Sequence, residues 1–196
     1  SFGQPLDDVI VQGRGASGGS MTLSLQGKRG LRISSAKTND DFRETIERAH
    51  RTIEAQGFVE GVDRLGAVVG KISDTSRDSF QSLCEWARSE ASPEKFAEKL
   101  STDGVAGAKR EQYQAIKDLL SPMVADPAEL VAATHRLLAH FILVRLEMLT
   151  EGSATEAQTV AQLATALAPE DKHRADDLWR RLLAQIGRAS CRERVS

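Results

Sequence analysis

The 196-residue chain is predicted to be an α/β protein, with a strand-rich first third followed by a helical region. Two short apolar segments near the start have the composition of strands, and a third apolar segment follows an amphipathic helix. From residue 76 onward, apolar positions recur at helical spacing between Pro and Gly breaks. The change from strand-like segments to helical spacing predicts a domain boundary near residue 75, or near 92 if a helix at 76–90 packs on the sheet.

The first third predicts a β-hairpin. Leu6–Gln12 contains three β-branched residues in succession, and the glycine-rich segment 13–20 favours a reversal of the chain over a helix. Apolar and polar residues alternate in Met21–Lys28, as in a strand with one buried face. We expect the two strands to lie side by side.

An amphipathic helix and a buried strand are expected next. Phe42, Ile46, Ala49 and Ile53 recur at helical spacing and predict a helix of about four turns. The segment 63–72 is mostly apolar, which favours another buried strand.

The rest of the chain is predicted to be wholly helical as far as residue 185. Breaks that contain Pro, Gly or Ser separate the expected helices, which span 76–90, 94–101, 108–121, 127–150, 155–167 and 171–185. The most apolar stretch, Val131–Leu149, carries His, Arg and Glu side chains and is too polar to span a bilayer. No membrane partner is expected.

The last eleven residues, 186–196, resemble a translated sequencing adapter, and we exclude them from the fold as an artefactual tail. We expect the natural chain to begin before Ser1 and to continue beyond Gln185. The tail carries three Arg and one Glu, so the net charge of −2 becomes −4 without it. A mildly acidic chain has no global attraction to nucleic acid, so any DNA contact must come from a local patch or from missing parts.

Cysteine and histidine usage indicates no disulfide and no zinc site. With Cys191 in the tail, Cys84 has no partner in the chain, which is consistent with a cytoplasmic location. Cys84 lies on an expected helix without basic neighbours, so we expect a buried structural thiol. His135 and His140 are five residues apart, whereas zinc ligands on one helix face are four apart.

One group of residues has the composition of a metal-dependent hydrolytic site. Asp7 and Asp8 precede the first strand, and Gln26 and Lys28 are two residues apart in the second, so their side chains share a face. A carboxylate is the kind of oxygen ligand that Mg²⁺ prefers. Gln26 would add an amide oxygen, and Lys28 would stabilise charge on a phosphate. Asp8 is preferred to Asp7 because it borders the apolar run.

The order of these residues resembles the PD-(D/E)XK nuclease superfamily, in which an Asp and a β-hairpin precede Glu or Gln, any residue, and Lys. The match is to the Gln-x-Lys branch of Mrr-like restriction endonucleases, also found at the N-terminal end of bacterial defence NTPases. It covers residues 2–73 and is carried by Pro5–Val11 and Leu23–Arg29. The resemblance implies an incomplete restriction-endonuclease-like fold, a mixed sheet with flanking helices, whose usual upstream helix would lie before Ser1.

The resemblance also implies an endonuclease that cuts DNA with Mg²⁺ or Mn²⁺ and takes part in antiviral defence. Asp8, Gln26 and Lys28 would be catalytic, with Asp8 and Gln26 as metal ligands, and Arg29 and Arg32 would contact DNA phosphates. The region 76–185 would link this module to a downstream NTPase or sensor domain of the same chain. The activity of the fragment alone and its assembly into a homo-oligomer are left open.

Two other functions are open from the residues alone. Gln26 and Lys28 could occupy the solvated face of a strand, and the helical region would then be the working part of a non-catalytic partner-binding protein. Wide separation of Asp8, Gln26 and Lys28 would favour that function. A degenerate nuclease fold would bind DNA without cutting it, even with Mg²⁺ or Mn²⁺.

Overall fold

A computed structural model gives the fold in two compact units, Ser1–Arg145 and Leu146–Ser196, each of which is described by itself. The residues that the structure describes are 9–14, 20–145, 152–166, 169–177 and 179–181.

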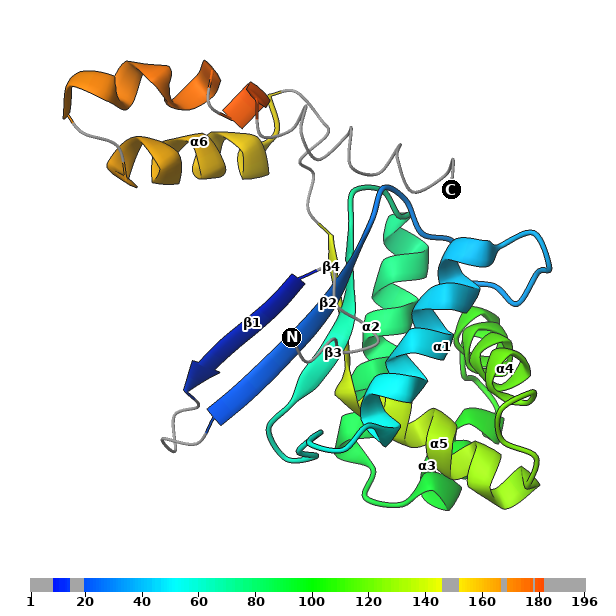
Figure 1. The fold of residues 1–196 in the computed structure, drawn as a ribbon. Coiled ribbons are helices and arrows are strands. Elements are labelled where there is room, and N and C mark those ends of the chain that lie inside the picture. Colours follow the sequence, from blue (N-terminus) through cyan, green and yellow to red (C-terminus); the bar gives the residue numbers. More distant parts are fainter. Residues whose placement is uncertain (1–8, 15–19, 146–151, 167–168, 178, 182–196) are drawn as a thin grey trace. The chain divides into compact units, whose positions relative to one another are not determined.

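A four-stranded sheet forms the centre of the first unit (Figure 1). Its strands, in spatial order, are β1 (Val9–Arg14), β2 (Ser20–Lys28), β3 (Arg64–Val69) and β4 (Phe141–Arg145). β1 is antiparallel to β2, whereas β2, β3 and β4 run parallel to one another. The predicted α/β class is confirmed, and so is the pairing of the first two strands.

Helices of the described part of the first unit cover the sheet. They are α1 (Asp40–Glu54), α2 (Asp74–Ser89), α3 (Pro93–Ser101), α4 (Gly107–Leu120) and α5 (Pro127–His140). All of them lie on the same side of the sheet (Figure 1). The parallel strands follow one another in chain order, so successive right-handed crossovers place their helices on the same face.

The hydrophobic core lies between this face and the helices. Leu65, Ala67 and Val69 of β3 and Phe141 and Leu143 of β4 are each 4 % exposed or less. They belong to one cluster with apolar residues of all five helices. The alternating residues of β3 and β4 on the opposite face, such as Val68 and Ile142, are only half-buried. The parallel strands therefore have one fully covered face.

Side-chain caps mark the starts of α2 and α5, whereas α4 begins without one. Ser73 accepts a hydrogen bond from the main-chain N–H of Ser76 at the start of α2. Asp126 accepts from two main-chain N–H groups at the start of α5, and Pro127 follows it as the first residue of the helix. These caps satisfy donors that a helix leaves unpaired.

The predicted helix 127–150 is wrong in its second half, because α5 ends at His140 and Phe141–Arg145 form β4. Periodicity cannot show whether a short apolar run after a helix continues the helix or forms a strand. Here the run becomes a strand because it pairs with β3. The region 76–185 is thus not wholly helical. The compact unit extends to Arg145, so α2 to α5 belong with the sheet and do not begin a new unit at 75 or 92.

The described part of the second unit contains α6 (Ala154–Ala166) and the short 3₁₀ helix η1 (Pro169–Arg174). The predicted helix 155–167 is confirmed over its described residues by α6. The first residues of the predicted helix 171–185 belong to η1, a 3₁₀ helix. The tail 186–196 lies outside the described residues. Within the described parts of the chain, no helix combines the length and the apolar character needed to cross a bilayer.

Gly66 permits the close approach of β3 and β4. A Cβ atom added at Gly66 would lie 1.8 Å from the main-chain oxygen of Ile142, its partner in the register. Overpacking costs about 1–3 kcal/mol, and here the obstacle is backbone, so Gly66→Ala should lower the free energy of unfolding by about 3 kcal/mol. Urea denaturation measures this change.

Gly61→Ala is the matched control, because a Cβ atom at Gly61 would meet no atom within 4 Å. Equal urea midpoints for the Gly66 and Gly61 variants would contradict the close contact of the two strands.

Candidate functional site

Two polar side chains of β2 point toward the helices. The register pairs Gln26 with Ala67 and Lys28 with Val69, and paired residues on neighbouring strands point to the same face. Gln26 is 3 % exposed and the Lys28 side chain 11 %. The two side chains share one face, as their spacing predicts, and that face lies under the helices and not in solvent.

Two carboxylates of α1 hold the Lys28 ammonium group. Lys28 Nζ lies 2.7 Å from Glu44 Oε2 and 3.3 Å from Asp41 Oδ1. Arg48 contacts the other oxygen of Glu44 at 2.6 Å. The hydrogen bond from Lys28 lowers the pKa of Glu44, against an opposing effect of burial, and the charges of Lys28 and Arg48 lower it further. Lys28 is thus fixed in place at the end of β2.

Thr45 of α1 contacts the Gln26 amide inside the protein. Thr45 Oγ1 lies 2.9 Å from Gln26 Oε1 and 2.7 Å from the main-chain oxygen of Asp41. Thr45 is fully buried. A buried amide without a partner would cost about 1–3 kcal/mol. Thr45 therefore stabilises the position of Gln26.

The residues of α1 that contact β2 were not predicted from the sequence. Its apolar residues, including Phe42 and Ile46, pack into the core, and Thr45 lies between them in the same buried stripe. A polar residue within an apolar stripe is the signal that would have identified Thr45. Asp41 and Glu44 gave no such signal, because acidic residues are common on exposed helix faces.

Asp8, the predicted carboxylate, and its neighbour Asp7 lie outside the described residues. The described part of β1 begins at Val9, which pairs with Leu25, the residue before Gln26. The structure thus brings Gln26 and Lys28 together with α1. The place of Asp8 beside them stays a prediction.

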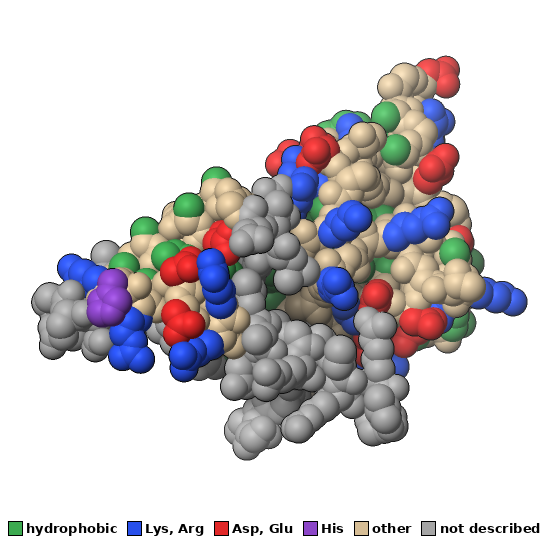
Figure 2. Space-filling model, turned by 90° about the horizontal axis from the view of Figure 1, so that it is seen from above, with side chains coloured by type: hydrophobic (Ala, Val, Ile, Leu, Met, Phe, Trp, Pro, Cys, Tyr) green, Lys and Arg blue, Asp and Glu red, His purple; other side chains and the backbone are tan. Residues whose placement is uncertain are grey.

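Arg29 and Arg32 are exposed in the segment that follows β2. The main-chain N–H of Leu31 donates to the main-chain oxygen of Lys71, which brings this segment beside the end of β3. Asn39 donates to the main-chain oxygen of Arg32 at 2.6 Å and fixes its course. Figure 2 shows the face seen from above, where Lys and Arg side chains are interspersed with Asp and Glu.

We call Arg29, Arg32 and Lys71 the basic surface. All three are exposed, and within the described part of the chain no carboxylate lies within salt-bridge distance of any of them. Their charges are therefore free to attract an anion.

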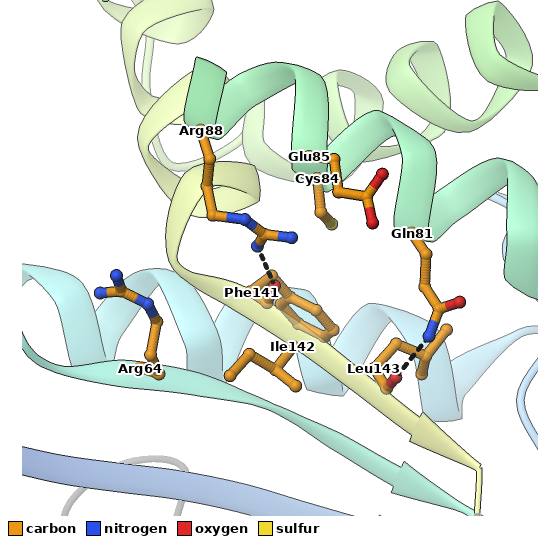
Figure 3. A pocket seen from close by; sticks show the side chains of 8 residues that line it. All are labelled: Arg64, Gln81, Cys84, Glu85, Arg88, Phe141, Ile142 and Leu143. Carbon is orange, nitrogen blue, oxygen red and sulfur yellow. Dashed lines mark hydrogen bonds between the residues drawn. The ribbon is translucent and has the colours of Figure 1, made fainter. Parts of the chain in front are cut away.

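A pocket of about 430 Å³ lies between α2 and β4 (Figure 3). Gln81 and Arg88 of α2 donate to the main-chain oxygens of Leu143 and Phe141, each at 3.2 Å. β4 is an edge strand, so these side chains satisfy acceptors that the sheet leaves unpaired. Gln81 and Arg88 are thus used by the fold.

Cys84, in the wall of this pocket, is a buried free thiol, as predicted. Burial raises the pKa of Cys84 to about 12, although the nearby Arg88 opposes the shift. A nucleophilic cysteine needs a thiolate. Cys84 therefore has a structural role.

The described residues form no cluster of three or more His, Cys, Asp or Glu side chains that could hold a metal ion. His135 Nε2 lies 3.0 Å from the main-chain oxygen of Glu90, and His140 Nδ1 lies 3.3 Å from that of Asp63. Both side chains are half-buried, and these contacts to main-chain oxygens are of the kind that histidines make for structural reasons.

No family model, curated protein or solved structure matches this chain. The function must therefore be inferred from the geometry. A side-chain amide and an ammonium group, the latter held by two carboxylates, lie side by side at the end of a central strand. They are next to the basic surface, which has no ion-pair partner among the described residues and can attract an anion.

Glu44→Gln should destabilise the protein by about 1 kcal/mol near pH 7, a small value because Glu44 is 42 % exposed and solvent screens the pair. Folding lowers the pKa of Glu44 below its ordinary value of 4.5. The stabilisation is therefore present above pH 4.5 and is lost as the pH falls through the lowered pKa. Urea denaturation near pH 7 and near pH 3 measures the difference.

Glu47→Gln is the control on the same helix, because Glu47 makes only a 3.7 Å ion pair with Arg51. We expect little effect from it at either pH. A Glu44→Gln deficit that persists undiminished near pH 3 would show that the ion pair with Lys28 is not its cause.

Proposed function

We propose that this chain contains a metal-dependent endonuclease module of restriction-endonuclease-like fold that hydrolyses phosphodiester bonds in DNA. Its catalytic residues are Asp8, Gln26 and Lys28. The observation that carries the proposal is the burial of Gln26 and Lys28 side by side on β2, on the face where β3 and β4 present apolar residues to the helices.

Burial of these two groups is costly. An amide or an ammonium group that leaves water loses solvation free energy, which partners must restore. Apolar side chains, like those at Ala67 and Val69 on the next strand, would pack under the helices without that cost. Polar groups that a fold keeps against such a cost are candidates for function. The solvated-strand alternative does not account for this burial.

Lys28 has the role of stabilising negative charge on the scissile phosphate. Glu44 and Asp41 hold its ammonium group beside Gln26, so the positive charge occupies a fixed position before substrate binds. A fixed charge needs no reorganisation during the reaction, and this is the main source of electrostatic catalysis.

The proposed donor set suits Mg²⁺ or Mn²⁺. Asp8 would supply a carboxylate and Gln26 an amide oxygen, and Mg²⁺ commonly uses one or two carboxylates and keeps several waters. When bound, the ion would polarise the phosphate and lower the pKa of the attacking water.

The basic surface is the proposed path of the DNA backbone. The whole chain has a net charge of −2, so attraction to DNA must be local. Arg29 and Arg32 directly follow the strand that bears Lys28, and Lys71 adds a third cation from the neighbouring connection. Phosphate contacts of this kind position a nucleic acid without reading its sequence.

The resemblance to the PD-(D/E)XK nucleases also suggests the kind of protein to which this module belongs. The hairpin, helix and parallel strand formed by β1, β2, α1 and β3 are compatible with the nuclease fold. We propose that the module belongs to a cytoplasmic bacterial antiphage defence protein, in which a linked NTPase or sensor domain controls cleavage.

One observation favours a degenerate nuclease that binds DNA without cutting it. Lys28 already contacts two carboxylates of its own protein, which would weaken its attraction to a phosphate. The cleavage experiment separates the two functions.

The full-length chain should cut duplex DNA in Mg²⁺, and EDTA should abolish the activity. Asp8→Ala and Lys28→Met should each lower the rate by about 100-fold or more, because each removes a group that stabilises charge in the transition state. Methionine retains most of the packing volume of Lys28. A plasmid-nicking assay with circular dichroism on each variant measures rate and folding.

Lys95→Ala is the control for a lost positive charge, because Lys95 is exposed on α3. Wild-type rates in both site variants would reject Asp8 and Lys28 as catalytic residues. Metal-independent binding by a wild-type protein that cuts nothing would identify the degenerate module.

Replacement of Arg29, Arg32 or Lys71 by Ala should weaken DNA binding equally for all sequences. Each lost phosphate contact should reduce the slope of log K against log salt by about 1. Fluorescence anisotropy over a series of salt concentrations, without divalent metal, measures the slope. An unchanged slope in all three variants, as expected for Lys95→Ala, would exclude the basic surface as the DNA contact.

A further inference from the structure

The hydrogen bonds of Thr45 restrict the orientation of the Gln26 amide. Thr45 Oγ1 has two neighbours within hydrogen-bond distance, Gln26 Oε1 at 2.9 Å and the main-chain oxygen of Asp41 at 2.7 Å. A hydroxyl carries one proton, and a main-chain oxygen can only accept. A proton shared between two acceptors gives two weaker bonds, so both short contacts are best satisfied when one of the two partners donates.

Of the two partners, only the Gln26 amide can act as a donor, because it carries an NH₂ group as well as an oxygen. The orientation of a side-chain amide is assigned from its hydrogen-bond network, since oxygen and nitrogen exchange places when the group turns by half a revolution. With the amide turned, Thr45 donates to Asp41 and Gln26 Nε2 donates to Thr45. Both contacts are then satisfied, and the amide oxygen faces away from Thr45.

We infer that Thr45 is a positioning residue that fixes the Gln26 side chain with its carbonyl oxygen free to bind an incoming cation. The inference rests on the proposed function for the identity of that cation as Mg²⁺ or Mn²⁺. It assigns to α1 a role in the site beyond covering the sheet. A divalent cation needs the oxygen and is repelled by the amide N–H groups, so the orientation decides whether Gln26 is a ligand.

The burial of the pair strengthens the argument. Thr45 is fully buried and Gln26 is 3 % exposed, so water cannot replace either hydrogen bond at low cost. Polar groups that orient a metal ligand from behind affect metal affinity or activity by about 10- to 100-fold when they are removed. Thr45 occupies this position behind Gln26.

The chain offers a matched control on the same helix. Thr52 is also buried, and its hydroxyl donates to the main-chain oxygen four residues earlier, that of Arg48, at 2.9 Å. Thr45 makes the equivalent bond to Asp41. Within the described residues, only Thr45 of this pair also contacts β2. Thr45→Val and Thr52→Val therefore remove the same hydroxyl from similar surroundings, and Thr45→Ser retains it.

The first readout is the Gln26 side-chain NH₂ signal in ¹⁵N–¹H NMR spectra of the full chain, assigned by its loss in Gln26→Glu. In the wild type we expect slow hydrogen exchange of this group and a shift of its signal on addition of Mg²⁺. Thr45→Val should speed the exchange. It should also raise, by about 10-fold, the Mg²⁺ concentration that gives half of the signal shift. Thr52→Val and Thr45→Ser should leave both properties close to those of the wild type.

The second readout is the Mg²⁺ concentration that gives half-maximal DNA cleavage. Thr45→Val should raise it by about 10-fold, with a smaller change in the rate at saturating Mg²⁺, because the ligand is misoriented and not removed. A structural role alone would give Thr45→Val and Thr52→Val the same result.

An unchanged Gln26 NH₂ signal in Thr45→Val would overturn the inference, as would equal behaviour of the two valine variants. The NMR readout does not need activity. A wild-type chain that never cuts DNA would reject the proposed nuclease, while the exchange of the Gln26 amide would still decide whether Thr45 positions it.

Discussion

The contact between β2 and α1 is the constraint on which the first unit depends. The helix must cover the apolar residues of β3 with one part of its surface and meet Gln26 and Lys28 with another. Its sequence satisfies both demands, since Phe42 and Ile46 enter the core while Thr45 and Glu44 reach the polar side chains of β2. A slip of β2 by one residue would turn Leu25 toward Thr45 and expose the amide and the ammonium group. The polar contacts thus favour the same strand register as the apolar ones.

The order of the strands explains where the candidate site lies. Parallel strands that follow one another across the sheet send all their crossovers to one face and end at one edge. Lys28 is the last residue of β2, and Arg29 and Lys71 lie just beyond the ends of β2 and β3. The buried amide, the held ammonium group and the basic surface therefore meet at the carboxyl edge of the parallel strands.

Local patterns in the sequence were sufficient to predict most of the first unit. Alternation predicted β2 and the shared face of Gln26 and Lys28, and helical spacing predicted α1. The fate of Phe141–Arg145 could not be predicted in this way, because a five-residue apolar run becomes a strand only when a partner such as β3 is available. Glu44 and Thr45 were missed for a related reason. Their importance comes from contacts with residues 19 and 16 positions earlier in the chain, which no local period encodes.

Different charged residues near β2 would attract DNA from a distance and act on a bound phosphate. Lys28 is mostly buried and contacts Glu44 and Asp41, so its positive charge is largely balanced at long range and contributes little to the attraction of a distant polyanion. The exposed cations of the basic surface have no such partners among the described residues, and their field extends into solvent. In the proposed reaction the basic surface would therefore bring DNA to the site. Lys28 would act only on a phosphate that comes close enough to compete with the two carboxylates, which limits its action to a correctly placed substrate.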